Sequence, residues 1–160
     1  MSKASEFKTN VMRILEQAKV PFKSHCYIDS GAVSGLEVAA ALGQDTAHVF
    51  KTLVTVGKSG EHFVFVVPVD SELDLKKAAK AVSDKSIEMI KSKDLFPLTG
   101  YIHGGCSPIG MKKQFRTVIH ESAAGLDMIF FSAGKIGYQI EIAPADLAKV
   151  LRFTYVDITD

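Results

Sequence analysis

The spacing of apolar and polar residues predicts a few amphipathic helices among many short strands. Apolar side chains recur at helical spacing over residues 5–19, and Pro21 lies where such a helix must end. Ser34 and Glu37 have the spacing of a capping box, which predicts a short helix that ends at Gly43. Further helices are predicted over residues 75–82, where the preceding Ser71 and Asp74 have the same spacing, over 92–98, and from Pro144 to near Leu151.

Runs of β-branched and aromatic residues predict the strands. The segment 63–67 is apolar at odd and even positions alike, which is typical of a strand that is covered on both sides. The other predicted strands are residues 22–28, 49–56, 87–90, 115–119, 128–131, 138–142 and 153–156. Because strands outnumber long helices and short turns join them, we expect an α+β fold. Its sheet should be curled and barrel-like, mixed but mainly antiparallel, with helices packed outside. At 160 residues we expect one domain spanning 1–160.

Lys51 is the one charged residue in the strand 49–56. Side chains alternate faces along a strand, so Lys51 shares its face with Val49, Leu53 and Thr55. A lysine in such surroundings needs a group that satisfies its charge. Either its stem lies along apolar surface and its ammonium group reaches water, or it points into a polar cavity.

Composition and charge exclude several classes of protein. The net charge of +1 gives no overall attraction to an anionic partner, so nucleic-acid binding would have to rest on local patches. Two cysteines argue against a disulfide framework and fit a reducing cytoplasm. The N-terminal segment does not have the pattern of a signal peptide, and the apolar run 63–69 is too short to span a bilayer, so we expect no membrane association.

A glycine-rich segment, residues 100–110, is the second candidate for chemistry. Adjacent glycines such as Gly104 and Gly105 let a ligand approach the backbone N–H groups, which can bind a carbonyl oxygen or a phosphate. The alternative is a plain loop that needs positive φ angles. The segment is not a nucleotide-binding P-loop, because Met111 displaces the required lysine by one position to Lys112.

Other reactive side chains give weaker hypotheses. Cys106 could be a nucleophile with His103 or His120 as its base, or it could simply be packed. His103 and Cys106 could be half of a zinc site, but no second ligand pair has matching spacing, so we expect no metal. Six basic residues could form a surface for a phosphate backbone, or simply solvated faces: Lys76, Lys77, Lys80, Lys112, Lys113 and Arg116.

Taken together, these residues resemble the YbaK/EbsC family of aminoacyl-tRNA deacylases, which is related to the editing domain of bacterial prolyl-tRNA synthetases. The matching segments, in chain order, are residues 20–22 with Tyr27, 50–53 (FKTL), 75–79, 100–101, 104–110 (GGCSPIG), 132–135 with Gly137, and 141–147. The FKTL and GGxSPxG elements in this order are more specific than either alone. The similarity is greatest to the YbaK branch, which clears Cys-tRNA(Pro).

The resemblance implies which residues act. Lys51 matches the essential lysine of the family, and the expected substrate-binding positions are Tyr27, Phe50, Thr52, Gly104, Gly105, Ser107 and Asp146. Asp146 also begins the last predicted helix, where a carboxylate favours the helix dipole without any function. The implied reaction is hydrolysis of the ester between a wrong amino acid and tRNA(Pro), without metal or cofactor, and with the cysteine thiol of the substrate as nucleophile.

Three alternatives stay open at this point. The enzyme could deacylate Ala-tRNA(Pro) with water as nucleophile, since small differences in pocket size decide such preferences. The chain could be a non-catalytic module that binds tRNA or a synthetase, or it could bind a small molecule. For recognition of tRNA(Pro), the weak overall charge offers no strong attraction to RNA, so we expect assistance from prolyl-tRNA synthetase.

Overall fold

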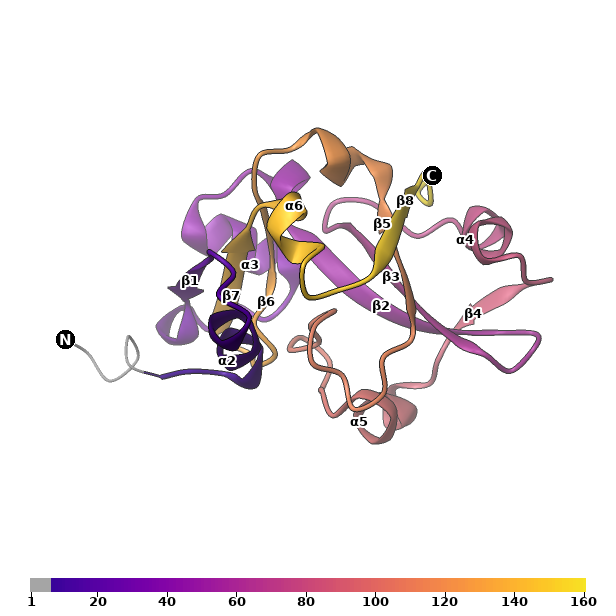
Figure 1. Ribbon diagram of the computed structural model, residues 1–160, viewed down its shortest axis with the longest axis horizontal. Helices are drawn as coiled ribbons and strands as arrows, with labels where there is room; N and C mark the ends of the chain where they lie inside the picture. The colour runs from indigo at the N-terminus through magenta and orange to yellow at the C-terminus, as the bar shows by residue number, and fades with distance from the viewer. Residues whose placement is uncertain (1–6) are drawn as a thin grey trace.

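The computed structural model describes residues 7–160, and its strands form two sheets (Figure 1). The first sheet is antiparallel, in the order β1 (Lys23–Cys26), β7 (Tyr138–Ile142), β6 (Ile129–Ser132). The second has the order β4 (Ile87–Met89), β2 (Phe50–Gly57), β3 (His62–Pro68), β5 (Arg116–His120), β8 (Phe153–Val156). In it β2 pairs antiparallel with β3 and β4, whereas the β3–β5 and β5–β8 pairs are parallel.

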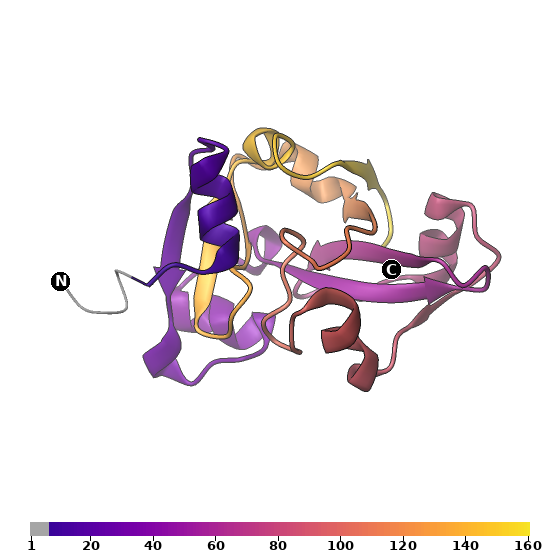
Figure 2. The ribbon, with the colours of Figure 1, turned by 60° about the horizontal axis from the view of Figure 1, so that its bottom comes forward.

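The two sheets meet at the start of β2, where Val49 forms a parallel bridge with Phe130 of β6. This confirms the predicted α+β class with a mixed, mainly antiparallel sheet and helices outside. The strands do not close into a barrel. The β2–β3 hairpin belongs to the larger sheet and extends away from the smaller one (Figure 2).

The helices are short and mostly begin where the sequence predicted. They are α2 (Asn10–Gln17), α3 (Gly35–Leu42), α4 (Leu75–Val82), α5 (Ser92–Thr99) and α6 (Pro144–Leu147), with 3-10 turns η1 (Ile28–Ser30), η2 (Thr46–His48) and η3 (Glu121–Gly125). Thr9 caps α2 by accepting the Met12 N–H, while the predicted start, Ser5, lies outside the described residues. Asp74 rather than Ser71 caps α4. The last helix ends at Leu147, earlier than predicted.

Strand β3 separates two parts of the core. Val64 and Val66 belong to one buried cluster, against which the partly buried Leu95 and Leu98 of α5 pack. Phe63, Phe65 and Val67 point the other way and pack against Ala78, Ala79 and Val82 of α4. The two helices therefore cover opposite faces of the larger sheet, as Figure 1 shows, because successive side chains of a strand alternate.

This division separates the basic residues that the sequence suggested as one surface. Lys76 and Lys80 belong to α4, whereas Lys112 adjoins α5. Among the helices of residues 7–160, none combines the length and apolar character that crossing a membrane requires.

Candidate active site

A pocket of about 230 Å³ lies where the two sheets meet. Its walls come from segments far apart in the sequence: Tyr27, residues 33–35 with Val38, residues 49–53, Leu95, residues 103–104 with Cys106, residues 131–132, and Gln139. The pocket is smaller than the usual site for a drug-sized ligand and suits a small group. The structure thus brings together the FKTL segment and the start of the glycine-rich segment, which the sequence identified separately.

Local interactions fix the start of α3 against this pocket. Ser34 accepts the Glu37 N–H and Glu37 accepts the Ser34 N–H, so the predicted capping box is present. A Cβ atom on Gly35 would lie 2.2 Å from Cγ1 of Val69, so only glycine lets the helix start approach the end of β3 this closely.

Lys51 lines the pocket, and its ammonium group has only a weak ion-pair partner among the described residues. Its side chain is 30% exposed, and its Nζ lies 3.9 Å from Oε1 of Glu72, whose own side chain is 83% exposed. An exposed pair at this distance contributes little. The ammonium group therefore has no strong partner among residues 7–160.

Thr52 and Gln139 add polar groups to the pocket wall. The Thr52 hydroxyl oxygen is buried and has no hydrogen-bond partner among the described residues. Gln139 is 2% exposed and exchanges two amide hydrogen bonds of 2.8 Å with Gln44, which fixes its side chain. Sequence reasoning missed Gln139, because nothing in the sequence distinguishes it from Glu141 on the same strand face, which pairs with His25 instead.

The glycine-rich segment contributes Gly104 to the pocket wall but not Gly105. Gly104 has a φ of +87°, and a Cβ there would lie 2.7 Å from Cγ1 of Val33, so glycine is required for both reasons. The Gly105 N–H donates to the Ile102 carbonyl at 2.9 Å and is not free for a ligand. Within residues 7–160 the Gly104 N–H has no acceptor. Of the two glycine amides, it is therefore the one that can donate a hydrogen bond to a substrate.

Ser107 and Asp146 stand apart from the pocket wall. Ser107 is fully buried, and its hydroxyl accepts the Ile109 N–H at 3.3 Å, which shapes the loop. Asp146 lies in α6, where its Oδ1 accepts from Nζ of Lys149 at 2.9 Å. The structure therefore gives both residues local roles and does not bring them to Lys51.

The two apolar positions predicted for substrate contact do lie in the pocket wall. Tyr27 and Phe50 are 6% and 3% exposed, so each presents only a small part of its ring. Burial raises the pKa of the Tyr27 phenol, and a backbone hydrogen bond from Gly137 opposes this effect. The phenol is neutral at physiological pH and can act as a hydrogen-bond donor.

The structure gives no support to Cys106 as a nucleophile. Burial raises the pKa of its thiol to about 12, and the thiolate is the reactive form. His103 also lines the pocket, but His120 is elsewhere, where its Nδ1 accepts the Ile158 N–H at 3.2 Å. Across residues 7–160, the His, Cys, Asp and Glu side chains form no group of three or more that could hold a metal ion.

Comparison with known proteins shows which sequences resemble this chain. Residues 30–150 match the model of the aminoacyl-tRNA editing domain family. EbsC of Enterococcus faecalis, proposed to be a Cys-tRNA(Pro)/Cys-tRNA(Cys) deacylase, is 48% identical over 158 residues, which cover 98% of this chain and 96% of that protein. The proline–tRNA ligase of Fervidobacterium nodosum is 27% identical over 106 residues, 59% of this chain and 18% of the ligase.

A solved structure confirms the architecture. The crystal structure of a protein proposed as a trans-editing enzyme for prolyl tRNA synthetase superposes with a TM-score of 0.83 at 23% identity. The superposition covers 96% of this chain and 99% of the other. At this level of identity the likeness concerns the fold alone.

Proposed function

Because this chain belongs to the aminoacyl-tRNA editing domain family, we propose that it is a deacylase that clears mischarged Cys-tRNA(Pro). The pocket would hold the cysteinyl group at the 3′ end of the tRNA, and its limited volume of about 230 Å³ suits a small side chain.

The observation that carries this proposal is the position of Lys51. Lys51 is a residue of the pocket wall, and among residues 7–160 its ammonium group has only a distant, exposed carboxylate as partner. An aminoacyl ester is already activated, so positioning and charge stabilisation can suffice for its cleavage. In the proposal Lys51 binds the ester region or the terminal phosphate and stabilises the negative charge that develops on the carbonyl oxygen.

The nucleophile in the proposal is the thiol of the substrate cysteine. Its sulfur forms a bond to its own carbonyl carbon, the bond from that carbon to the ribose oxygen breaks, and the thiol proton ends on the ribose hydroxyl. The products are free tRNA and a cyclic thioester that water opens to cysteine. This route requires no thiolate from the protein, in keeping with the neutral Cys106.

The other wall residues receive binding roles. In the proposal the Gly104 N–H donates to the ester carbonyl, and the Thr52 hydroxyl gains the hydrogen-bond partner that it lacks among residues 7–160. Tyr27 and Phe50 limit the size of the side-chain pocket, and Gln139 gives it a fixed polar side. The proposal gives Asp146 no role, because its carboxylate pairs with Lys149 and the residue is not part of the pocket wall.

The test is the release of amino acid from Cys-tRNA(Pro), Ser-tRNA(Pro), Ala-tRNA(Pro) and Pro-tRNA(Pro). Serine is the matched control, since it replaces only the sulfur by the less nucleophilic oxygen. Rapid release of cysteine alone is the expected result. Equal release of serine and cysteine would contradict the thiol mechanism, and release of alanine would require water as the nucleophile. No release from any of them, by folded protein with prolyl-tRNA synthetase present, would contradict the enzyme assignment in favour of a binding module.

We further propose that prolyl-tRNA synthetase assists the selection of tRNA(Pro). A net charge of +1 gives no strong long-range attraction to RNA. Selectivity for Cys-tRNA(Pro) over Cys-tRNA(Cys) should therefore rise when the synthetase is added at physiological salt. Equal selectivity with and without the synthetase would overturn this part of the proposal.

A further inference from the structure

An aromatic side chain is exposed on α5, the helix that contributes Leu95 to the pocket wall. Phe96 of α5 is 55% exposed, although phenylalanine is usually buried. It follows Leu95, a residue of the pocket wall, so the two Cα atoms are about 3.8 Å apart. The ring is therefore exposed on the helix that supplies a residue of the pocket wall.

A lysine is held against this ring. The Lys112 Nζ lies 5.1 Å from the centroid of the Phe96 ring, a cation–π distance. The backbone N–H of Lys112 donates to the Thr99 carbonyl at 2.9 Å, which ties the lysine to the end of α5. In the part of the chain that the structure describes, the Lys112 ammonium group has no carboxylate within ion-pair distance.

The segment of the chain that carries the ring is basic. The sequence around α5 and the following loop carries one acidic side chain, Asp94, and four lysines: Lys91, Lys93, Lys112 and Lys113. The net charge of the whole chain is only +1, so positive charge is concentrated here relative to the average. Aromatic rings beside lysines are the usual means of binding single-stranded nucleic acid, since bases stack on the ring and phosphates pair with the cations.

We propose that Phe96 and Lys112 form a stacking platform for the single-stranded 3′ end of the RNA substrate. The terminal nucleoside and its amino acid enter the pocket, and the base immediately 5′ of it stacks on Phe96 while its phosphate contacts Lys112. This inference rests on the proposed function, because it assigns the platform to the RNA whose ester occupies the pocket.

The experiment compares a long and a short substrate. Phe96→Ala should raise KM for Cys-tRNA(Pro) about tenfold with little change in kcat, because the lost stacking involves no reacting atom. Phe96→Trp should restore binding, and Lys76→Ala on the opposite sheet face should have no effect. Hydrolysis of 3′-O-cysteinyl-adenosine, which lacks the second base, should be the same for wild type and Phe96→Ala.

RNA binding gives a readout that does not depend on hydrolysis. The affinity of the protein for an uncharged stem-loop with a single-stranded 3′ end should fall about tenfold in Phe96→Ala. Lys112→Met should reduce the slope of log affinity against log salt by about 0.7. If the stem-loop binds in this way but no cysteinyl ester is cleaved, the proposed function fails and the platform stands.

Three results would overturn the platform itself. One is unchanged KM and RNA affinity in Phe96→Ala. The second is an equal loss on cysteinyl-adenosine, which would place Phe96 in the pocket instead. The third is a loss seen only when prolyl-tRNA synthetase is present, which would make the ring a contact for a protein partner.

Discussion

At the scale of single residues, the pocket combines a charge and a hydroxyl that the fold leaves without strong partners. Lys51 has only the distant Glu72, and the buried Thr52 hydroxyl has no partner among residues 7–160. Leaving a buried polar group unsatisfied costs about 1–3 kcal/mol. Such a cost is expected at a site where a ligand supplies the missing hydrogen bond.

Thr52→Val tests this interpretation, because valine keeps the shape and removes the hydroxyl. We expect the free energy of unfolding to rise by about 1 kcal/mol while kcat/KM for Cys-tRNA(Pro) falls about tenfold. The matched control is Thr55→Val on the same strand. The Thr55 hydroxyl donates to the Phe63 carbonyl at 3.0 Å, so its loss should lower stability by about 1 kcal/mol. A decrease in stability for both variants in urea unfolding would contradict the account.

At the scale of elements, the pocket depends on where α3 begins. Its capping box and the close contact between Gly35 and Val69 fix the first turn, which forms part of the pocket wall. Stability of this helix and substrate binding are therefore coupled.

Ser34→Ala removes the side chain that caps α3. Loss of an N-cap hydroxyl should lower the free energy of unfolding by about 1 kcal/mol and raise KM, since the helix start would fray into the pocket. Ser24→Ala in β1 is the control, because Ser24 is exposed and its hydroxyl makes no hydrogen bond within residues 7–160. Denaturant unfolding and deacylation kinetics measure both effects, and an unchanged KM in a destabilised Ser34→Ala would show that the two are independent.

Elements with strong local signals could be predicted from the sequence. The capping box before α3, the apolar run 63–67 within β3 and Pro144 at the start of α6 each specify their own conformation. The cap of α4 could not be predicted, because Ser71 and Asp74 both have capping chemistry and only the tertiary structure selects Asp74. The place where the two sheets meet is marked by the bridge between Val49 and Phe130, two residues far apart in sequence that carry no local signature of this contact.

Only part of the candidate site could be predicted, because a local sequence pattern does not reveal contacts between distant segments. Lys51 and Gly104 carry signals of their own, an unexpected charge in a strand and a pair of glycines. Gln139 enters the pocket wall through its pairing with Gln44, 95 positions away, which no local pattern reveals. Asp146 matches the family motif, but its carboxylate pairs with Lys149, two residues after the end of α6, rather than with a residue of the pocket.

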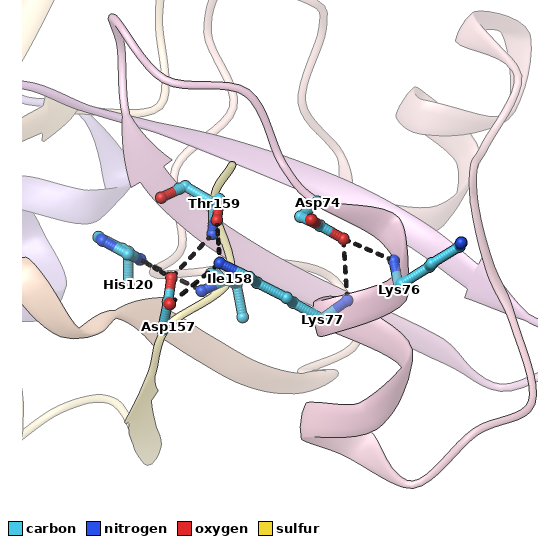
Figure 3. Close-up of polar contacts among 7 residues, drawn as sticks. All are labelled: Asp74, Lys76, Lys77, His120, Asp157, Ile158 and Thr159. Atoms are coloured by element: carbon cyan, nitrogen blue, oxygen red, sulfur yellow. Dashed lines mark hydrogen bonds and ion pairs between the residues drawn. The ribbon is translucent and has the colours of Figure 1, made fainter.

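At the scale of the whole molecule, the C-terminal residues attach α4 to the larger sheet. Lys77 of α4 donates to the Asp157 carboxylate at 3.0 Å and to the Thr159 carbonyl at 2.7 Å. The Ile158 N–H donates to Nδ1 of His120 at the end of β5, and the Ile158 side chain is fully buried (Figure 3). These contacts connect three segments that are distant in sequence.

This attachment predicts a pH dependence of stability. The hydrogen bond from Lys77 holds the pKa of Asp157 below its ordinary value of 3.8. A carboxylate with a depressed pKa in the folded state stabilises the protein above its unfolded pKa, and this contribution disappears as the pH falls through the folded value. Asp157→Asn should therefore lower Tm at pH 7, and the difference from wild type should vanish well below pH 3.8. Thermal unfolding across this range measures it, and a difference that persists in acid would mean that the carboxylate charge is not the cause.

The most direct test of the central claim compares Lys51→Ala with Lys76→Ala in the release of cysteine from Cys-tRNA(Pro). Both variants should remain folded, since Lys51 has only a weak ion pair and Lys76 is exposed. Lys51→Ala should lose about 100-fold or more in kcat, because it removes the cation that stabilises the developing charge. Lys76→Ala should match wild type. Near-normal turnover by folded Lys51→Ala would show that this pocket does not cleave the ester through Lys51.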